Sequence, residues 1–303
     1  HLVMSVRTDD EAQLIVTDLD GGAERALSLP GDGFVSNLQS ADRGELIGYT
    51  FSDADLDASG GLESALFTAS LKESEADAAP TQVAVTGVDP RVAEWRFVPD
   101  TDRILLLGFD ASLILTGPDG GDATALGSAL EIEGIARGSS TAIVERGAGP
   151  VAIDLSDASE TPLVAAGIEL GLPGPVTPVP GGGTVRLGAP TDEAGIPLGT
   201  TVAAVAEDGT TEVLMELPST DVVLQTCVSP SGRYAAVLVA PDAVANPYDR
   251  YQLPLPEKLE TRVVELPARS GETGGPGEDP EGTGAEIVAL SGLDISWCQV
   301  PPR

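Results

Sequence analysis

A short apolar strand that recurs along the chain is the feature of this sequence that most constrains its fold. Six such segments lie 38 to 58 residues apart. They cover residues 2–7, 46–51, 104–109, 142–145, 185–189 and 234–240. A repeat of this length is typical of arrays such as solenoids and propellers, so it indicates the architecture before any single motif does.

The surroundings of these strands repeat as well. Most follow a turn rich in Gly, Pro, Asp or Ser, such as residues 99–102 (PDTD) or 180–183 (PGGG), and a further short strand such as 92–98 precedes the turn. A hairpin partner such as 201–206 comes next, then an acidic or Gly-rich turn and a fourth strand such as 211–217. Four short strands in roughly 40–50 residues make the blade of a β-propeller.

We therefore predict an all-β, six-bladed β-propeller with four antiparallel strands per blade, formed by residues 1–303 as one domain. The chain begins at a second strand and ends after a lone first strand, so residues 1–30 and 293–300 are expected to complete one closing blade without open edges. Two alternatives are a seventh blade within the insertions and a tandem of two β-sandwiches, which explains neither the repeat nor the complementary ends. The insertions are expected at about 52–63, 241–260 and 268–284.

Charge and histidine content exclude several classes of function. The chain has 48 Asp and Glu against 16 Lys and Arg, a net charge of −32. Such a charge repels phosphate backbones, so nucleic acid and anionic membrane surfaces are poor partners. His1 is the one histidine, which excludes Ser-His-Asp triads, Cys-His dyads and multi-histidine metal sites. Two lysines against fourteen arginines fit a GC-rich genome.

Several short motifs in the repeat resemble those of TolB-like and WD40-like propellers. Residues 227–234 (CVSPSGRY) are similar to the SPDGR-hydrophobic turn of TolB-like propellers, with Ser231 in place of Asp. Residues 14–22 (LIVTDLDGG) resemble the strand and turn that end the blades of these propellers. The tryptophan at the start of residues 95–100 and of residues 297–301 resembles the tryptophan that precedes the SPDGR turn. The resemblance implies the fold and a binding or scaffolding module of a bacterial envelope, of actinobacterial type, and carries over no catalytic residue.

The two cysteines occupy matched positions. Cys227 and Cys298 each lie three residues before a proline, on first strands expected in neighbouring blades. Side chains at such sites come close enough for a disulfide, which would tie the C-terminal strand into the ring and indicate an oxidising compartment. The alternative is a pair of buried free thiols.

An acidic loop in the second repeat has the spacing of a calcium loop. Residues 55–63 (DLDASGGLE) offer Asp55, Asp57, Ser59, the carbonyl of Gly61 and Glu63 as oxygen ligands. Calcium takes about 6–8 oxygens from a tight loop of this kind, and the segment resembles the calcium loops of integrin-type propellers, with Ser59 replacing the usual Asp or Asn. The predicted cofactor is therefore a structural Ca²⁺, and a solvated acidic hairpin is the alternative.

A Pro-rich insertion at residues 241–260 holds Tyr248, Arg250 and Tyr251. Proline reduces the entropy lost on docking, and Tyr and Arg are favoured anchors at interfaces. These three residues are the predicted partner-binding site, with packing of the loop on its own blade as the alternative.

These features predict a non-catalytic, extracytoplasmic propeller that is a protein-interaction or accessory module of a cell-envelope assembly, and not an enzyme. Because the chain starts at His1 within a strand, we expect a signal, lipid anchor or membrane helix upstream, with truncation as the alternative. The alternative function is a calcium-dependent hydrolase or lactonase with acids at the central channel.

Overall fold

The structure, a computed structural model, describes residues 2–7, 12–17, 24–42, 45–55, 61–72, 78–243, 259–267 and 288–291. These residues form β-strands joined by turns and loops, and none of them lies in an α-helix. The all-β prediction is confirmed.

The strands follow the chain in groups. The first group is β1 (Leu2–Arg7), β2 (Ala12–Thr17) and β3 (Arg25–Leu27). The second is β4 (Gly33–Ser40), β5 (Leu46–Asp53), β6 (Ala65–Ser70) and β7 (Thr81–Gln82). The third is β8 (Val92–Phe97), β9 (Ile104–Gly108), β10 (Ser112–Thr116) and β11 (Thr124–Ser128). The fourth is β12 (Glu131–Ile135), β13 (Thr141–Arg146), β14 (Gly149–Asp154) and β15 (Glu160–Pro162). The fifth is β16 (Leu172–Pro178), β17 (Thr184–Ala189), β18 (Gly199–Val205) and β19 (Thr211–Pro218). The last is β20 (Val222–Val228), β21 (Tyr234–Ala240), β22 (Glu260–Glu265) and β23 (Val288–Ser291).

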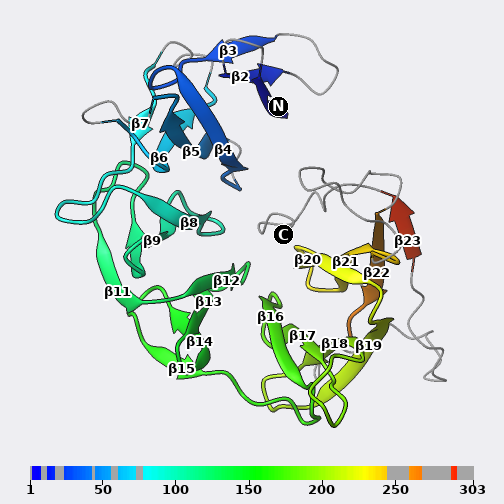
Figure 1. Cartoon of the computed structure of the whole chain (residues 1–303). Helices are drawn as coiled ribbons and strands as arrows, with labels where there is room; N and C mark the ends of the chain where they lie inside the picture. The colour runs from blue at the N-terminus through cyan, green and yellow to red at the C-terminus, as the bar shows by residue number, and fades with distance from the viewer. Residues whose placement is uncertain are drawn as a thin grey trace, which may run out of the picture. The chain divides into compact units, whose positions relative to one another are not determined.

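Each group of four is one sheet in which consecutive strands pair, which is the blade of a β-propeller. Figure 1 shows these groups as successive meanders along the chain. The four-stranded blade is therefore confirmed, with its second strands at the predicted positions.

The predicted number of six four-stranded blades is wrong for the described residues, which form five such blades and one three-stranded sheet, β1–β3. The prediction completed that sheet with residues 293–300, which lie outside the described residues. Ring closure and the single domain of residues 1–303 stay predictions. The physical reason is that local alternation locates a strand but does not determine its pairing with a partner almost 300 residues away.

The turn between the first and second strands has the same closure in four of the five blades. The amide of the residue after the first strand donates to the carbonyl five residues on, at 2.8–2.9 Å. These pairs are Ala41–Leu46, Val98–Arg103, Ala136–Thr141 and Ser229–Tyr234. In the turn that resembles SPDGR, Gly232 adopts a φ of 70° and the Ser229 hydroxyl accepts the Tyr234 amide at 3.1 Å. A glycine is favoured there because a Cβ disfavours positive φ.

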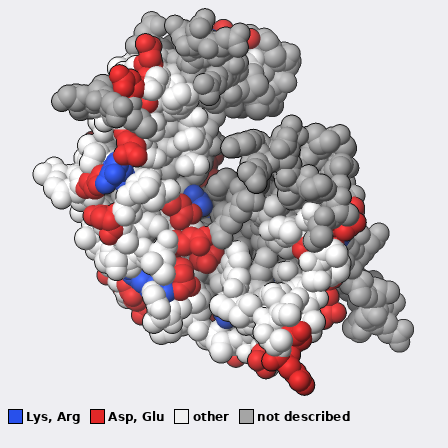
Figure 2. All heavy atoms as spheres, in the orientation of Figure 1, with Lys and Arg blue, Asp and Glu red and all other residues white. Residues whose placement is uncertain are grey.

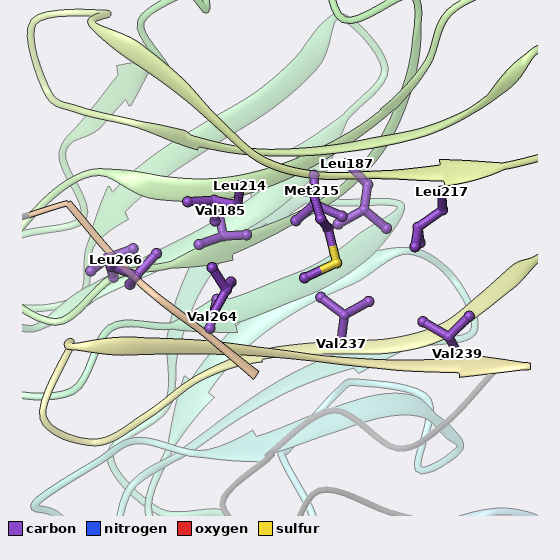
Figure 3. Close-up of a cluster of buried hydrophobic side chains, with 12 residues drawn as sticks. Val185, Leu187, Leu214, Met215, Leu217, Val237, Val239, Val264 and Leu266 are labelled. Carbon is purple, nitrogen blue, oxygen red and sulfur yellow. The ribbon is translucent and has the colours of Figure 1, made fainter. Parts of the chain in front are cut away.

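The core lies between the faces of neighbouring sheets. In Figure 3, apolar side chains of the β16–β19 blade point towards those of the β20–β23 blade. Val202 and Val237 are fully buried in this cluster. Branched aliphatic side chains at alternating positions fill the space between two sheets, which explains how a chain with 4% aromatic residues builds a core.

Trp95 supplies the bulk of the core on β8. Its ring is 0% exposed and packs edge-to-face against Phe97, with 5.3 Å between the centroids. A Cβ on Gly48, in the neighbouring blade, would lie 2.5 Å from the Cη2 atom of the indole. The absence of a side chain at residue 48 therefore makes room for the tryptophan.

The chain divides into two compact units, and the division falls within the β12–β15 sheet. One unit is mostly His1–Ile132 and the other is mostly Glu160–Arg303. In the part of the chain that the structure describes, no helix could cross a membrane.

Four first strands carry a β-bulge against their second strands. The register shifts lie between Ser36 and Gln39, between Val92 and Glu94, between Pro173 and Val176, and between Val223 and Gln225. A bulge places two residues opposite one and redirects the side chains beyond it. In β4 and β8 the redirected side chain bonds to the first strand of the following blade.

We call these bonds between successive first strands the latches. Gln39 donates to the Trp95 carbonyl at 3.0 Å, and a Glu94 carboxylate oxygen accepts the Ile132 amide at 2.7 Å. A Glu133 carboxylate oxygen accepts the Val176 amide at 3.0 Å, and the Thr177 hydroxyl donates to the Thr226 carbonyl at 3.2 Å. Each latch lies within one of the two compact units. In each latch a side chain of one first strand bonds to a backbone group of the next first strand.

The two ends of a blade differ in their connections. At the turn end, the first strand connects to the second and the third to the fourth. At the loop end, where the first strand begins, the second strand connects to the third. The second-to-third connections are residues 54–64, 109–111, 147–148, 190–198 and 241–259. The predicted insertions at 52–63 and 241–260 therefore both leave a loop end.

Candidate functional site

The predicted calcium loop connects β5 to β6, and the structure describes part of it. Asp55, Gly61 and Glu63 lie in described segments, whereas Asp57 and Ser59 lie outside them. Within the described residues no three Asp, Glu, His or Cys side chains are grouped to hold a metal ion. The five-residue ligand set and the bound Ca²⁺ stay predictions.

The base of this loop is well ordered by hydrogen bonds. Asp53 and Leu62 pair through the Asp53 amide and the Leu62 carbonyl at 2.9 Å, and an Asp53 carboxylate oxygen accepts the Leu62 amide. A Glu63 carboxylate oxygen lies 3.4 Å from an Arg91 guanidinium nitrogen. An arginine within ion-pair distance competes with a cation for the same carboxylate, so the Arg91 pair opposes calcium binding at Glu63.

The predicted partner-binding residues Tyr248, Arg250 and Tyr251 lie outside the described residues, and the structure describes only the two bases of their insertion. The Asp242 amide donates to an Asp221 carboxylate oxygen at 3.1 Å. The other Asp221 oxygen lies 3.4 Å from Arg262, which also pairs with Glu260. The Asp221 carboxylate therefore holds both sides of the opening from which the insertion leaves the β20–β23 blade.

Cys227 lies in β20 and is 3% exposed. It is not a free thiol, and no cysteine among the described residues is free. Cys298 lies outside the described residues, so the pairing of the two cysteines stays a prediction.

Exposed apolar side chains gather at the loop ends, which the sequence pattern did not predict. Among the described residues, eleven large hydrophobic side chains are exposed, and seven of them lie at loop ends. The seven are Phe34, Phe109, Leu130, Leu172, Ile196, Leu198 and Val222. Single exposed apolar residues are ordinary, but here they recur at the loop ends of blades within each of the two compact units.

Acidic side chains also lie at the loop ends. Asp and Glu side chains far outnumber Lys and Arg side chains on the face shown in Figure 2. At the loop ends the acids include Asp89, Asp110, Asp192, Glu193 and Asp221. These ends are therefore both apolar and negatively charged.

Among the described residues, Phe109 is the most exposed aromatic side chain at a loop end, at 57%. It follows β9 at a tight turn in which the Ala111 amide donates to the Gly108 carbonyl at 3.0 Å and Ala111 adopts a φ of 65°. Asp110 accepts the Ser112 amide at 3.0 Å, and its hydrogen bonds to Ser112 lower the pKa of the carboxyl. The turn therefore fixes the backbone from which the phenyl ring projects.

Arg91 packs beside that ring. Its guanidinium carbon lies 5.6 Å from the Phe109 ring centroid, which is the range of a cation–π contact. Asp89 orients the guanidinium through an ion pair of 2.7 Å, and Glu63 adds the longer contact described above. We call Arg91 and Phe109, with their supports Asp89 and Glu63, the Arg91 cluster.

The Asp89 carboxyl should titrate near pH 2. The Arg91 side chain and backbone amide hold its pKa at about 2. An ordinary Asp titrates near about 3.9, so this group stabilises the fold fully above about pH 4 and less as the pH falls towards 2. Replacing Arg91 with Met should raise the pKa towards the ordinary value, as followed by carboxyl-carbon NMR.

Asp208 provides the control for this titration. Hydrogen bonds from Thr210 lower the pKa of its carboxyl, so Arg91→Met should leave it unchanged. A midpoint for Asp89 that stays the same in the variant would contradict the assignment to Arg91.

Comparisons with known proteins support the fold and no more. No protein-family model and no curated protein matches the sequence. A solved prolyl endopeptidase matches with a TM-score of 0.55 at 14% identity, over 92% of this chain and 38% of its own. The tricorn protease matches with a TM-score of 0.43 at 15% identity, over 87% of this chain and 30% of its own. Hydrazine synthase of Kuenenia stuttgartiensis matches with a TM-score of 0.46 at 12% identity, over 87% of this chain and 69% of its own. At these identities the likeness shows the fold alone, so the chain is a β-propeller, and its relation to TolB-like or WD40-like proteins stays a prediction.

Proposed function

We propose that this protein is a non-catalytic β-propeller that binds a protein partner at the loop ends of its blades. The observation that carries the proposal is the Arg91 cluster, in which a hydrogen-bonded turn places an aromatic ring that is 57% exposed beside an arginine. Arg and aromatic residues are enriched among the few side chains that supply most of the binding energy at protein interfaces. A fixed turn reduces the entropy lost on docking.

The partner should present a basic surface with apolar side chains on it. The acids at the loop ends and the net charge of −32 favour a cationic partner, and the exposed Phe109, Ile196 and Leu198 side chains require apolar contacts. The insertion with Tyr248, Arg250 and Tyr251 leaves the loop end of its own blade and belongs to the same proposal.

An extracytoplasmic location, as an accessory module in a cell-envelope assembly, is also part of the proposal. The predicted disulfide between Cys227 and Cys298 would fit this location, because disulfides persist mainly outside the reducing cytoplasm. A structural Ca²⁺ at residues 55–63 would fit the same compartment. The alternative of a calcium-dependent hydrolase or lactonase stays a prediction, because the likeness to peptidases shows the fold alone.

Site-specific crosslinking tests the proposal. A photoreactive phenylalanine at position 109 or 198, in the protein expressed in its native host, should crosslink one defined partner. The same probe at Val213, which is 43% exposed on β19 and away from the loop ends, should not. With that partner purified, Phe109→Ser should weaken binding by about thirtyfold, as expected for a central interface residue, and Val213→Ser by less than about twofold.

Two results would count against the proposal. One is the absence of a defined crosslink at both loop-end positions. The other is a partner that crosslinks at Val213 but not at position 109 or 198, which would place the interface on the outer strands. Unchanged circular dichroism of each variant ensures that the comparison reports binding and not folding.

A further inference from the structure

A second candidate site lies at the turn end of the β16–β19 blade. Between this blade and the β20–β23 blade the structure has a pocket of about 450 Å³. It is lined by the turn from β16 to β17, the turn from β18 to β19, Gly232, and the segment that follows β22. All of these residues belong to one compact unit. The volume lies within the range of about 300–1,000 Å³ that is usual for ligand pockets.

The floor of the pocket is apolar. Val179, Val205 and Leu266 line it but are at most 8% exposed, so most of the apolar surface open to a ligand comes from the exposed Ala206 and Pro267. Val179 and Leu266 also belong to the core shown in Figure 3, which fixes their positions. A ligand group on this floor gains apolar contact without rearranging the protein.

The rim is negatively charged. Glu207, Asp208 and Glu212 line the pocket, and none of the described residues that line it is Lys, Arg or His. Hydrogen bonds from Thr210 lower the pKa of Asp208 and keep its carboxylate ionised. An anion would meet three carboxylates here without a compensating positive charge, whereas a cation is attracted.

The Gly-rich turn sets the position of Glu207. Gly181, Gly182 and Gly183 have positive φ values of 82°, 118° and 78°. A Cβ at residue 182 would lie 2.6 Å from the Glu207 Oε1 atom, so the glutamate side chain lies directly against the Gly182 backbone. Hydrogen bonds within both turns, from Gly182 to Val179 at 2.9 Å and from Ala206 to Thr210 at 2.8 Å, hold this arrangement.

We propose that this pocket binds a Lys or Arg side chain of an extended peptide segment. The aliphatic stem would lie on the apolar lining, to which Ala206 and Pro267 contribute exposed surface, and the charged head would meet Glu207 and Asp208 at the rim. Lys and Arg combine an apolar stem with a charged end, which matches an apolar floor beneath an acidic rim. The described residues group no three acids for a metal ion, and an organic cation needs no such grouping. A pocket of 450 Å³ exceeds what a single side-chain head fills, which favours a peptide over a small free amine.

Titration of the whole protein with three probes tests the proposal by NMR, through the amide shifts of Gly181, Gly182 and Thr210. The peptide acetyl-Ala-Lys-Ala-amide should bind with a Kd of about 0.1–1 mM at low salt. Acetyl-Ala-norleucine-Ala-amide has the same stem without the charge and should bind at least about tenfold more weakly. Butylamine, which has the charge without the peptide, should also bind more weakly. Raising the salt from about 10 mM to about 1 M should weaken the lysine peptide, because the acids are exposed.

Variants assign the binding to the rim. Glu207→Gln and Asp208→Asn should each weaken the lysine peptide by about fivefold, as expected for exposed ion pairs. Gly182→Ala should have an effect similar to Glu207→Gln, because the new methyl group displaces the Glu207 carboxylate. Glu216→Gln is the matched control, since Glu216 lies on β19 but does not line the pocket. If Gly182→Ala fails to fold, Glu207→Gln and Asp208→Asn still test whether the rim carboxylates bind the lysine peptide.

Three results would overturn the proposal. They are no binding of the lysine peptide below about 10 mM, equal binding of the norleucine peptide, and equal binding of butylamine. The second would indicate an apolar pocket, and the third a site for small amines. Because the pocket lies at the turn end, these outcomes are independent of partner binding at the loop ends, which the crosslinks at positions 109 and 198 report.

Discussion

Replacing Trp95 with alanine is expected to lower the free energy of unfolding by about 3–5 kcal/mol. The indole is 0% exposed and packs against Phe97 on one side. On the other side it lies over Gly48, which has no side chain that could move into the space left behind. The cavity would therefore stay largely unfilled, and the loss of dispersion contacts would add to the transfer free energy of the ring. Urea unfolding followed by far-UV circular dichroism measures the change.

Phe109→Ala is the matched control for this prediction. It also removes an aromatic ring, but one that is 57% exposed, so its effect should stay within about 0.5 kcal/mol. A loss below about 1 kcal/mol for Trp95→Ala, or equal losses for the two variants, would show that the ring does not support the core as described.

Glu94→Ala should destabilise the fold by about 3–5 kcal/mol through a different mechanism. One carboxylate oxygen accepts the Ile132 amide at 2.7 Å, and the other pairs with Arg96, whose side chain is 4% exposed. Removing the carboxylate takes the acceptor from a buried amide and the counter-charge from a buried guanidinium, and both losses are costly.

Two further variants separate these contributions. Glu94→Gln keeps an acceptor for the Ile132 amide and loses only the charge, so it should cost less than Glu94→Ala. The double variant Glu94→Leu and Arg96→Leu should recover part of the loss, because an apolar pair replaces a buried ion pair at little cost. A double-mutant cycle from urea unfolding gives the coupling free energy. A coupling near zero would contradict the pairing of Glu94 with Arg96.

The sequence predicted the strands well because their signals are local. The predicted segment 234–240 coincides with β21, and the predicted turns at 99–102 and 230–232 lie where the structure closes its hairpins. Alternating apolar residues and turn residues act within a few positions, so one chain suffices to recognise them. Blade number and closure depend on pairing between distant segments, which no local pattern encodes.

The candidate sites were less accessible to sequence reasoning. The apolar pattern predicts a strand over residues 104–109, whereas β9 ends at Gly108 and Phe109 is 57% exposed. The Asp110 and Ser112 pair is a turn signal that could have separated the phenylalanine from the strand. The pocket at the turn end was not foreseen, since residues 180–183 were interpreted only as a turn. A pocket forms where two blades meet, and the sequence does not show which turns become neighbours.

The latches have a consequence for how this repeat protein can evolve. Propellers grow by duplication of blades, and a duplicated blade is neutral only if each copy fits both neighbours. Here the side chain that makes the latch is a donor in two cases, Gln39 and Thr177. It is an acceptor in the other two, Glu94 and Glu133. A copy of the β8–β11 blade inserted beside itself would present Glu94 to another β8 strand and not to the Ile132 amide. Each latch uses a different side chain, so exchanging two blades would also exchange the polar bonds to their neighbours.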